Sequence, residues 1–312
     1  MSDKIQTYTI AEFLETQGNT LAHDVEFSIY RLEEIHNDIP VKSPLFRANY
    51  YTIVLIRDGQ GRYIIDSQAY DTHNRTIYFT NPGHVKGFEM HRLTYGYVIT
   101  FGESFLKQYV SDNILDEFPF LIAEVVPPHY PEPDIFQIFD RLGEQILQEY
   151  QNDSAYKFKV IGSLTVVLLL KIKEHFWNNY NPLAESSTKS AIVLEFQRNL
   201  ENHFRNLVSG KYDNESSPGE NRIFQVQDYA QAQHLHPSYF STVIKRKTGK
   251  SVSTWIAEKV VAEAQAMLAR TPDSVQEIAF RLGFKDAAHF SRFFKKHTEM
   301  SPSGFRQNLE SM

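Results

Sequence analysis

The apolar positions of this chain change period along its length, and the first clear pattern is that of strands. Short β-branched and aromatic runs lie at 51–57, 62–66, 76–80 and 95–101, separated by turn residues, and such runs predict strands. The turn sequence Asp58-Gly59-Gln60-Gly61 predicts a hairpin between the first two. Residues 1–48 show little periodicity, so we expect only short strands and loops there. Together these runs predict a barrel or a sandwich for the amino-terminal part.

From Asp134 onward the apolar residues follow helical spacing. Residues 135–147 predict one helix and residues 156–177 a second, in which the run 166–170 is apolar nearly all round. That run predicts burial on more than one side of the helix, either within the chain alone or partly against a second subunit. The polar segment 178–190, with its single proline, predicts a linker between domains. Residues 192–207 predict the first helix of the next domain, with an apolar face of Leu194, Phe196, Leu200, Phe204 and Leu207.

The stretch 274–306 predicts two short helices joined by a tight turn. Ser274 and Glu277 have the spacing of a capping box, which opens the first helix. Gly283 ends that helix, because a left-handed position suits a residue without a Cβ, and Asp286 is a good N-cap for the next helix. Three aromatic residues at helical spacing then face inward, namely Phe290, Phe293 and Phe294. A short helix that buries aromatics and shows small, polar and basic residues is typical of the recognition half of a helix-turn-helix, although an ordinary helical hairpin is the alternative.

The same pattern occurs fifty residues earlier, which indicates a duplicated supersecondary unit. Phe240, Ser241, Lys245, Thr248 and Ser251 correspond to Phe290, Ser291, Lys295, Thr298 and Ser301. We therefore expect one helix-turn-helix at about 226–247, a linker helix at 253–269 and a second helix-turn-helix at about 274–297. A linker of that length spans about 25 Å, so it can hold two recognition helices near the ~34 Å repeat of the major groove.

These motifs resemble the DNA-binding domain of the AraC/XylS family of transcription regulators. The resemblance rests on Phe-x-x-x-Ile-Lys-x-x-Thr-Gly at 240–249, Ile-Ala-x-x-Leu-Gly-Phe at 278–284, His-Phe-Ser-Arg-x-Phe-Lys-Lys at 289–296 and Ser-Pro-x-x-Phe-Arg at 301–306. It implies an α+β chain of two domains: a cupin-like effector and dimerisation barrel at 1–180, then, after a linker at 181–190, an all-α DNA-binding domain at 191–312. In the amino-terminal half the resemblance is weaker and rests on the regular spacing of the predicted strands and on the turn Asn81-Pro82-Gly83-His84.

Three positions depart from the family pattern. Glu299 stands where the family has glycine, and a left-handed backbone there would cost a residue with a Cβ about 1 kcal/mol, so we expect a rearranged corner. Lys259 stands where the linker helix usually carries arginine. The loop 209–221 is longer than usual.

Charge is divided unevenly between the two halves. The net charge is −6, but residues 189–312 hold 17 Lys+Arg against 13 Asp+Glu, which leaves +4 there and −10 in the rest. A net charge of +4 is modest, so phosphate contacts must come from local clusters of lysine and arginine such as 245–247 and 295–296. The chain has no cysteine, which excludes disulfides and thiolate metal sites. A polar amino terminus and the shortness of the longest apolar run predict a cytoplasmic protein.

The family resemblance implies that outward residues of both recognition helices contact double-stranded DNA. Arg292 is the candidate for reading a guanine, with a phosphate contact or an intrachain ion pair as alternatives. The candidates are, in the first unit, Ser238, Tyr239, Ser241, Thr242, Lys245 and Arg246, and in the second unit Lys285, Ala287, Ala288, His289, Arg292, Lys295 and Lys296.

The barrel is expected to bind a small-molecule effector, of a chemistry that the sequence leaves open. Its histidines, His73, His84 and His91, lack the His-x-His pair of metal cupins, so we expect no metal, no cofactor and no enzyme. Aromatic residues suited to stacking a ligand or filling the barrel are Tyr51, Tyr63, Tyr78, Phe79, Phe88, Tyr95 and Tyr97. The alternatives are a regulator whose amino-terminal domain only dimerises or binds a protein, and a cupin enzyme with an appended DNA-binding domain.

Overall fold

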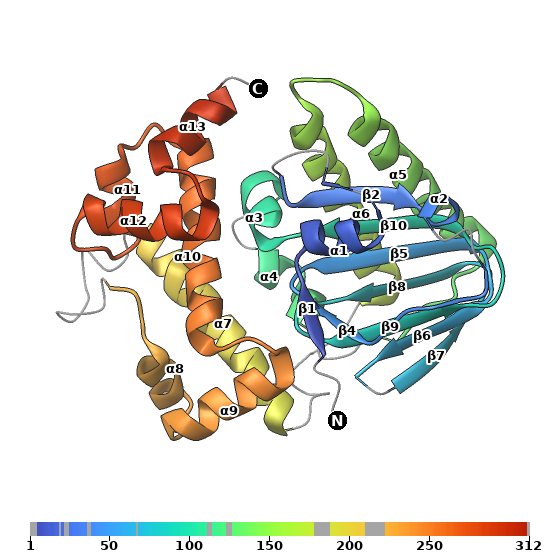
Figure 1. The fold of residues 1–312 in the computed structure, drawn as a ribbon, viewed down its shortest axis with the longest axis horizontal. Coiled ribbons are helices and arrows are strands. Elements are labelled where there is room, and N and C mark those ends of the chain that lie inside the picture. Colours follow the sequence, from blue (N-terminus) through green and yellow to red (C-terminus); the bar gives the residue numbers. More distant parts are fainter. Residues whose placement is uncertain are drawn as a thin grey trace.

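The computed structural model has a β-rich amino-terminal part and a helical carboxyl-terminal part that lie side by side (Figure 1). It describes residues 5–18, 20–21, 25–35, 39–66, 68–110, 114–122, 127–177, 188–209 and 222–310. The predicted linker therefore falls largely outside the described residues, as does the predicted long loop from residue 210 onward. Among the described helices, none has the length and apolar character needed to cross a membrane.

Two sheets face each other in the amino-terminal part (Figure 1). The larger has the order β1-β4-β9-β6-β7, with β3 also paired to β9, and the smaller has the order β2-β10-β5-β8. The bounds of the larger sheet's strands are β1 Gln6–Tyr8, β3 Val41–Lys42, β4 Phe46–Ala48, β6 Gly61–Ile65, β7 Gln68–Thr72 and β9 Val85–Met90. Those of the smaller sheet's strands are β2 Phe27–Arg31, β5 Tyr51–Asp58, β8 Thr76–Thr80 and β10 Tyr95–Phe101.

The four strands expected from the alternation are present, but the predicted hairpin is wrong. Strand β5 pairs with β10 and β8, whereas β6 pairs with β7 and β9 in the opposite sheet. The reason lies in β5, which is buried from Tyr51 to Ile56 on both faces. A strand buried on both faces belongs in the centre of a covered sheet. After Asp58 the chain therefore crosses to the other sheet.

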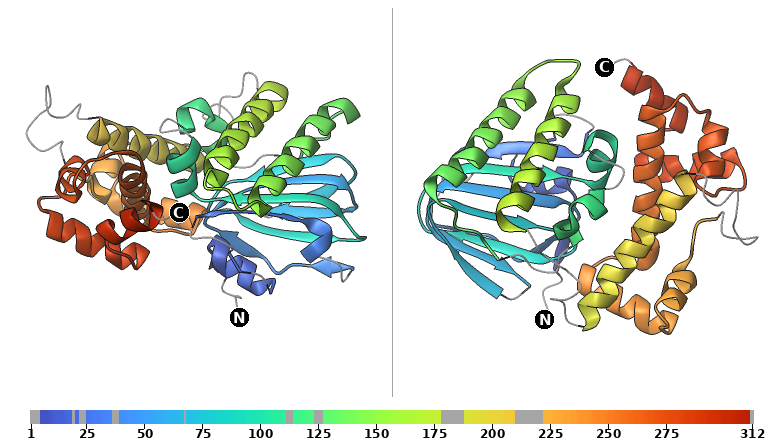
Figure 2. Two further views of the ribbon diagram at one scale, coloured as in Figure 1. Left: turned by 90° about the horizontal axis from the view of Figure 1, so that it is seen from above. Right: turned by 180° about the vertical axis from the view of Figure 1, so that it is seen from behind.

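Two long helices cover the outer face of the smaller sheet, as Figure 2 shows. They are α5, Pro133–Gln151, and α6, Lys157–Phe176, both close to the predicted limits. Alternate residues of β5 divide between two cores: Tyr51, Ile53 and Leu55 pack toward the helices, and Val54 and Ile56 pack into the barrel. Shorter elements complete this part, namely α1 Ile10–Thr16, α2 Leu32–Ile35, α3 Glu103–Phe105, η1 Leu106–Val110, α4 Ile114–Glu117 and η2 Pro119–Ile122.

The same alternation sorts the aromatic residues that the sequence left undecided. Tyr63, Tyr78 and Phe88 point into the barrel, whereas Tyr51, Phe79 and Tyr97 belong to the core beneath the helices. Tyr95 is exposed. Helix α6 is buried along one side only, because Val160, Val167 and Leu170 are exposed in the single chain.

In the described residues 188–209 and 222–310, seven helices form the carboxyl-terminal part around one core. The core includes Phe196, Phe204, Phe240, Phe290 and Phe294, each with no exposed surface. Leu194, Leu200 and Leu207 are also buried, as the apolar face of 192–207 predicts. The helices are α7 Thr188–Val208, α8 Val226–Ala232, α9 Pro237–Thr248, α10 Val252–Arg270, α11 Val275–Arg281, α12 Ala287–Thr298 and α13 Pro302–Glu310.

Candidate nucleic-acid interface and ligand cavities

Helices α11 and α12 form the second helix-turn-helix unit, which we call unit 2. The capping box at its start is made as predicted, with Ser274 Oγ accepting from Glu277 N at 3.2 Å and Glu277 Oε2 accepting from Ser274 N at 2.7 Å. Gly283 has φ +80°, and a Cβ added there would lie 2.9 Å from backbone atoms of Arg222. Asp286 caps α12 by accepting from His289 N. Local sequence therefore fixes the turn that aims the recognition helix.

Helices α8 and α9 repeat this arrangement with different residues, and we call them unit 1. His234, at φ +53°, takes the left-handed position of Gly283. Leu235 N donates to Ala230 O just as Phe284 N donates to Ala279 O, both at 2.9 Å. His236 caps α9 and Pro237 begins it, a position that suits proline because its missing N–H is not needed there. The duplicated pattern in the sequence is therefore a duplicated structure.

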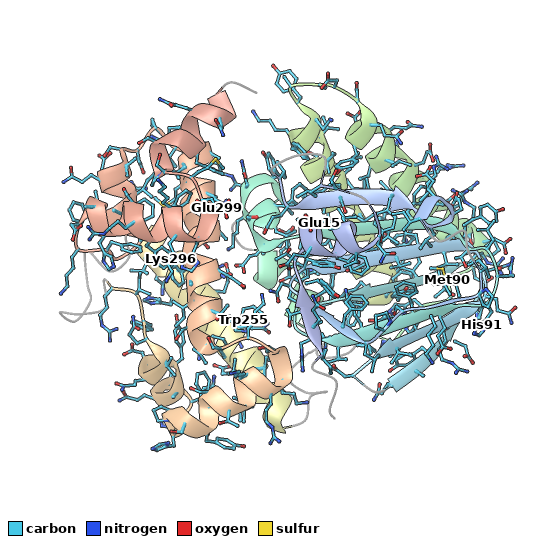
Figure 3. All side chains as sticks on the ribbon, in the orientation of Figure 1. Glu15, Met90, His91, Trp255, Lys296 and Glu299 are labelled. Carbon is cyan, nitrogen blue, oxygen red and sulfur yellow. The ribbon has the colours of Figure 1, made fainter. Side chains whose placement is uncertain are left out.

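The carboxyl ends of the two recognition helices also match, and here one expectation is wrong. Thr248 Oγ1 donates to Ile244 O, and Thr298 Oγ1 donates to Phe294 O, each at 2.9 Å. Gly249 follows with φ +78°, and Glu299 follows with φ +62°. Glu299 is labelled in Figure 3. The corner at Glu299 is therefore not rearranged, because the Thr298 hydrogen bonds and the Glu299 N–H to Lys295 O bond hold it.

The proposed DNA-contacting side chains lie on the open faces of α9 and α12. In α12 Arg292, Lys295 and Lys296 are exposed, with no ion pair among the described residues. In α9 Lys245 and Arg246 are exposed in the same way. The remaining candidates are exposed or half-buried, namely Ser238, Tyr239, Ser241, Thr242, Lys285, Ala287, Ala288 and His289. Among the described residues, none of these five basic side chains is therefore held in an ion pair that would compete with phosphates.

A buried ion cluster joins the two halves of the molecule, and the sequence gave no sign of it. Lys259 Nζ, on α10, lies 2.9 Å from Glu103 Oε1 and 3.1 Å from Glu263 Oε1, and it also contacts Glu201. Lys107 Nζ, on η1, contacts Glu201 and lies 3.3 Å from Glu263 Oε1. Both lysine side chains are 1% exposed. A lysine suits position 259 because a single ammonium serves three carboxylates from three helices.

The charge states in this cluster follow from its geometry. Although burial alone would raise it, the pKa of Glu201 is lowered to about 2 by Lys259 and Lys107. Burial opposes the charged form of Lys259, but Glu103, Glu201 and Glu263 raise its pKa above the ordinary value. Glu201 and Lys259 are therefore both ionised at neutral pH. Buried pairs of this kind are costly to break from one side.

A second link joins the barrel to the end of the first recognition helix. Arg47, on β4, donates through Nη1 to Lys247 O at 3.3 Å and through Nη2 to Arg246 O at 3.4 Å. Its Nη1 also donates to Gly83 O in the β8–β9 turn. The last carbonyls of a helix carry partial negative charge, so a guanidinium is well placed there.

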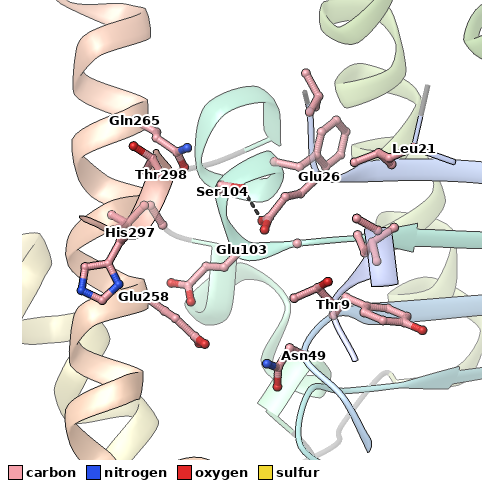
Figure 4. Close-up of a pocket in the computed structure, with 18 of the residues that line it drawn as sticks. Thr9, Leu21, Glu26, Asn49, Glu103, Ser104, Glu258, Gln265, His297 and Thr298 are labelled. Atoms are coloured by element: carbon pink, nitrogen blue, oxygen red, sulfur yellow. Dashed lines mark hydrogen bonds between the residues drawn. The ribbon is translucent and has the colours of Figure 1, made fainter. Parts of the chain in front are cut away.

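Between the two halves lies a cavity of about 650 Å³. Figure 4 shows Glu103 and Glu258 reaching into it from α3 and α10, with Glu26 behind Ser104. Unit 2 faces the same cavity through His297, Thr298 and Met300. Burial raises the pKa of Glu258 above its ordinary value, in spite of its 2.6 Å pair with Lys250. The barrel part and the helical part thus both line this space.

A second cavity, of about 60 Å³, lies inside the barrel between the two sheets. Its walls are aromatic and aliphatic, with Lys86 of β9 among them. Lys86 Nζ donates to Thr52 Oγ1 and Thr80 Oγ1, both at 2.9 Å. Sequence analysis missed this lysine, although strict alternation along β9 places it with Phe88 and Met90 on the inward face.

The histidines weighed as metal ligands lie apart. His84 Nδ1 is 2.6 Å from Asp66 Oδ2, His91 Nε2 is 3.8 Å from Glu89 Oε2, and His73 stacks on Tyr130. In the part of the chain that the structure describes, no group of three histidine or carboxylate side chains is arranged to hold a metal ion. The geometry offers two exposed basic helix faces and the barrel cavity as the sites to be explained.

Two family models match the chain. Residues 42–157 match the AraC-like ligand binding domain, and residues 229–308 match a helix-turn-helix domain. Among curated relatives, the uncharacterized HTH-type transcriptional regulator YobQ of Bacillus subtilis is 35% identical over 86 residues, which cover 28% of this chain and 36% of that protein. The arabinose operon regulatory protein of Salmonella typhimurium is 26% identical over 172 residues, which cover 55% of this chain and 54% of that protein.

The match thus spans about half or less of the length of these relatives. Among solved structures, ToxT from Vibrio cholerae O395 has a TM-score of 0.38 and 14% identity, over 92% of this chain and 99% of that one. The two matched domains follow one another in the order of barrel and helix-turn-helix, and together they account for more than half of the chain. The chain belongs to the AraC/XylS family of transcription regulators.

Proposed function

We propose that this chain is a sequence-specific transcription regulator that binds double-stranded DNA through both helix-turn-helix units. The observation that carries the proposal is the repeat of cap, left-handed turn and recognition helix in units 1 and 2, mounted at the two ends of α10. Helix α10 has 19 residues, which corresponds to a length of about 28 Å. Two recognition helices at that separation suit neighbouring major-groove faces of one duplex.

Within this proposal the barrel at 1–180 is the effector domain and residues 191–312 are the DNA-binding domain. Arg292 reads a base edge, and an alanine methyl of Ala287 or Ala288 meets a thymine methyl. Lys245, Arg246, Lys295 and Lys296 contact phosphates. The hydroxyl-rich face of α9, with Ser238, Ser241 and Thr242, discriminates bases more weakly than Arg292.

The effector acts through the contacts that join the two halves. A ligand changes an equilibrium only by binding one state more tightly than the other. The ion cluster at Lys259 and the Arg47 contact with α9 hold the present arrangement, so a second arrangement must break or shift them. The barrel cavity lies between β4, which carries Arg47, and the strands that follow it.

The proposal extends to a homodimer. Val160, Val167 and Leu170 leave an apolar strip on α6 exposed in the single chain, and a second copy would cover it. A non-enzymatic protein acting in the cytoplasm completes the proposal, in keeping with relatives that are named as transcription regulators. A regulator whose barrel only dimerises is the second candidate, and this apolar strip favours it specifically.

Binding of the full chain to a random pool of DNA duplexes at several salt concentrations tests the proposal. We expect enrichment of particular sequences and a linear fall of log affinity with log salt concentration. Lys295→Ala and Lys296→Ala should each reduce the salt slope by about 1 while weakening binding to all sequences. Lys171→Ala, on the far helix α6, serves as the control and leaves the slope unchanged. Absence of any enriched sequence would refute the proposal.

A further inference from the structure

The cavity inside the barrel contains a buried cation without a buried counter-charge. Lys86 is 6% exposed, and within the described residues no carboxylate pairs with it. The titratable groups that line the cavity with it are tyrosines: Tyr30 of β2, Tyr50 before β5, Tyr63 of β6 and Tyr78 of β8. Burial raises the pKa of each of these tyrosines, so they are neutral. An isolated buried charge is costly unless something pairs with it.

The polar groups around Lys86 are rich in donors and poor in acceptors. Two N–H groups of Lys86 donate to Thr52 and Thr80, which leaves the third N–H of the ammonium and the hydrogen of the Thr52 hydroxyl without a hydrogen-bond acceptor in the described residues. The buried hydroxyl of Tyr63 lines the same cavity and has Thr80 of the same group as its hydrogen-bonding neighbour. Buried polar groups are normally satisfied. A group with more donors than acceptors around one space calls for a ligand that only accepts.

An ionised carboxylate has this character, because both of its oxygens accept and neither donates. The remaining walls are apolar or aromatic and suit a short hydrocarbon tail, since Phe46, Val54, Phe88, Met90 and Val98 line them. The volume of about 60 Å³ corresponds to roughly four to six water-sized positions. That is the size of acetate, propionate or butyrate.

We propose that the effector of this regulator is a small organic carboxylate, held inside the barrel by Lys86, Thr52, Thr80 and Tyr63. The inference rests on the proposed function, and it adds the chemical class of the ligand. Lys86 Nζ also lies 4.8 Å from the centroid of the Tyr50 ring and 5.8 Å from that of Phe46. These rings hold the ammonium in place by cation–π attraction and shield the ion pair from water.

The ionisation of Lys86 gives the proposal a distinctive signature. Burial lowers the pKa of Lys86 to about 7. At pH 8 the lysine is therefore mostly neutral, and a bound carboxylate favours its charged form. Binding at pH 8 should take up close to one proton, whereas binding at pH 6 should take up almost none.

The test is thermal unfolding of the full chain with short carboxylates and with their amides at matched ionic strength. We expect acetate, propionate or butyrate to raise the melting temperature with concentration, and acetamide, propionamide and butyramide to leave it unchanged. Lys86→Met should weaken carboxylate binding at least tenfold. Lys42→Met removes an exposed lysine on the outside of the barrel and should respond as the unchanged protein does.

If Lys86→Met does not fold, Thr80→Val provides the second variant, because it removes one donor and keeps the shape. It should weaken carboxylate binding severalfold. Calorimetry at pH 8 in buffers of different ionisation enthalpy then counts the protons taken up. Equal effects of acids and amides, an unchanged response in both variants, or binding without proton uptake would overturn the inference.

DNA binding measured in the same preparations separates this inference from the proposed function. Lys86→Met should still select DNA from a random pool, because the lysine is enclosed in the barrel. A chain that binds DNA but no carboxylate overturns only the ligand class. A chain that binds carboxylates but no DNA supports the ligand class and overturns the proposed function.

Discussion

Units 1 and 2 share one backbone design but differ in what surrounds them. Unit 1 is held to the barrel by Arg47, and the Cδ of that arginine is 2.5 Å from where a Cβ of Gly249 would lie. Unit 2 faces the interdomain cavity at the corresponding end and carries Glu299 there. The outward face of α9 carries hydroxyls, and that of α12 carries Arg292. We infer that unit 1 transmits the state of the barrel and that unit 2 contributes more to base selection.

Helix α10 supports both units, so breaking its buried ion cluster should have the largest effect on both. Lys259→Met removes the partner of Glu103 in the cluster and leaves Lys107 to pair with Glu201 and Glu263. We expect the free energy of unfolding to fall by about 3–5 kcal/mol, as measured by urea denaturation. Lys171→Met removes an exposed pair with Glu174 and should cost less than about 1 kcal/mol. Similar losses in the two variants would contradict a structural role for the cluster.

Arg292→Ala tests whether unit 2 contributes more to base selection than unit 1 does. We expect a loss of about 1–3 kcal/mol at the preferred DNA site and a relaxed preference at one base pair. Thr242→Val, in unit 1, should cost less than that. Arg281→Ala lies in unit 2 but pairs with Asp273 at 3.0 Å, and should leave selectivity unchanged. An equal loss on preferred and random DNA would reassign Arg292 to a phosphate.

Acid pH should weaken the packing of α7 that supports unit 1 before it weakens the packing that supports unit 2. His203, on α7, stacks on Phe224 with ring centroids 3.6 Å apart, and its Nε2 lies 2.9 Å from Arg222 O. Chiefly because of burial, its pKa is lowered to about 4. The unfolded chain, with the ordinary value near 6.5, therefore binds the proton more readily. The stability that neutral His203 provides is present above pH 6.5 and is lost as the pH falls toward 4.

Urea denaturation at pH 7 and pH 5 measures this effect. We expect a loss of about 2 kcal/mol in the unchanged protein from His203 alone. His203→Gln should show a smaller dependence on pH over the same interval. The pKa of Glu201, about 2 in the folded chain, affects stability only below its ordinary value near 4.5, so the two windows are distinct. A variant with the same pH dependence would contradict this assignment.

The left-handed residues at the ends of α9 and α12, Gly249 and Glu299, allow the most local comparison of the two units, with the smallest expected effect. Glu299→Gly should raise the free energy of unfolding by about 1 kcal/mol, because a residue with a Cβ is strained at φ +62°. Gly249→Ala should lower it by at least as much, since it adds the same strain and meets Arg47. Calorimetric melting of both variants checks the signs. If both changes have the same sign, the two corners are not equivalent.

Local patterns in the sequence were enough to predict the parts built from local interactions. The capping box at Ser274, the turn at Gly283 and the matched ends at Thr248 and Thr298 each depend on residues within one or two turns of helix. The rearrangement expected at Glu299 was wrong because the Thr298 hydroxyl and the helix end hold the corner.

The pairing of segments that lie far apart in the chain could not be predicted from the sequence. The predicted hairpin at 51–66 was wrong because the burial of β5 on both faces, rather than the turn sequence, determined which strands pair with β5. Arg47 and Lys107 acquire their roles from contacts about a hundred residues or more away along the chain. The role of Lys86 could not be predicted because its hydrogen-bond partners Thr52 and Thr80 come from other strands.

The measurement that tests the central claim most directly is the set of DNA sites that the full chain selects from a random pool. The account predicts two short sequence elements about one helical turn apart, roughly 10 base pairs between centres. Arg292→Ala should erase preference in one element, and Thr242→Val should weaken it in the other. Selection of a single element, or of no sequence at all, would contradict the claim that both units bind one duplex.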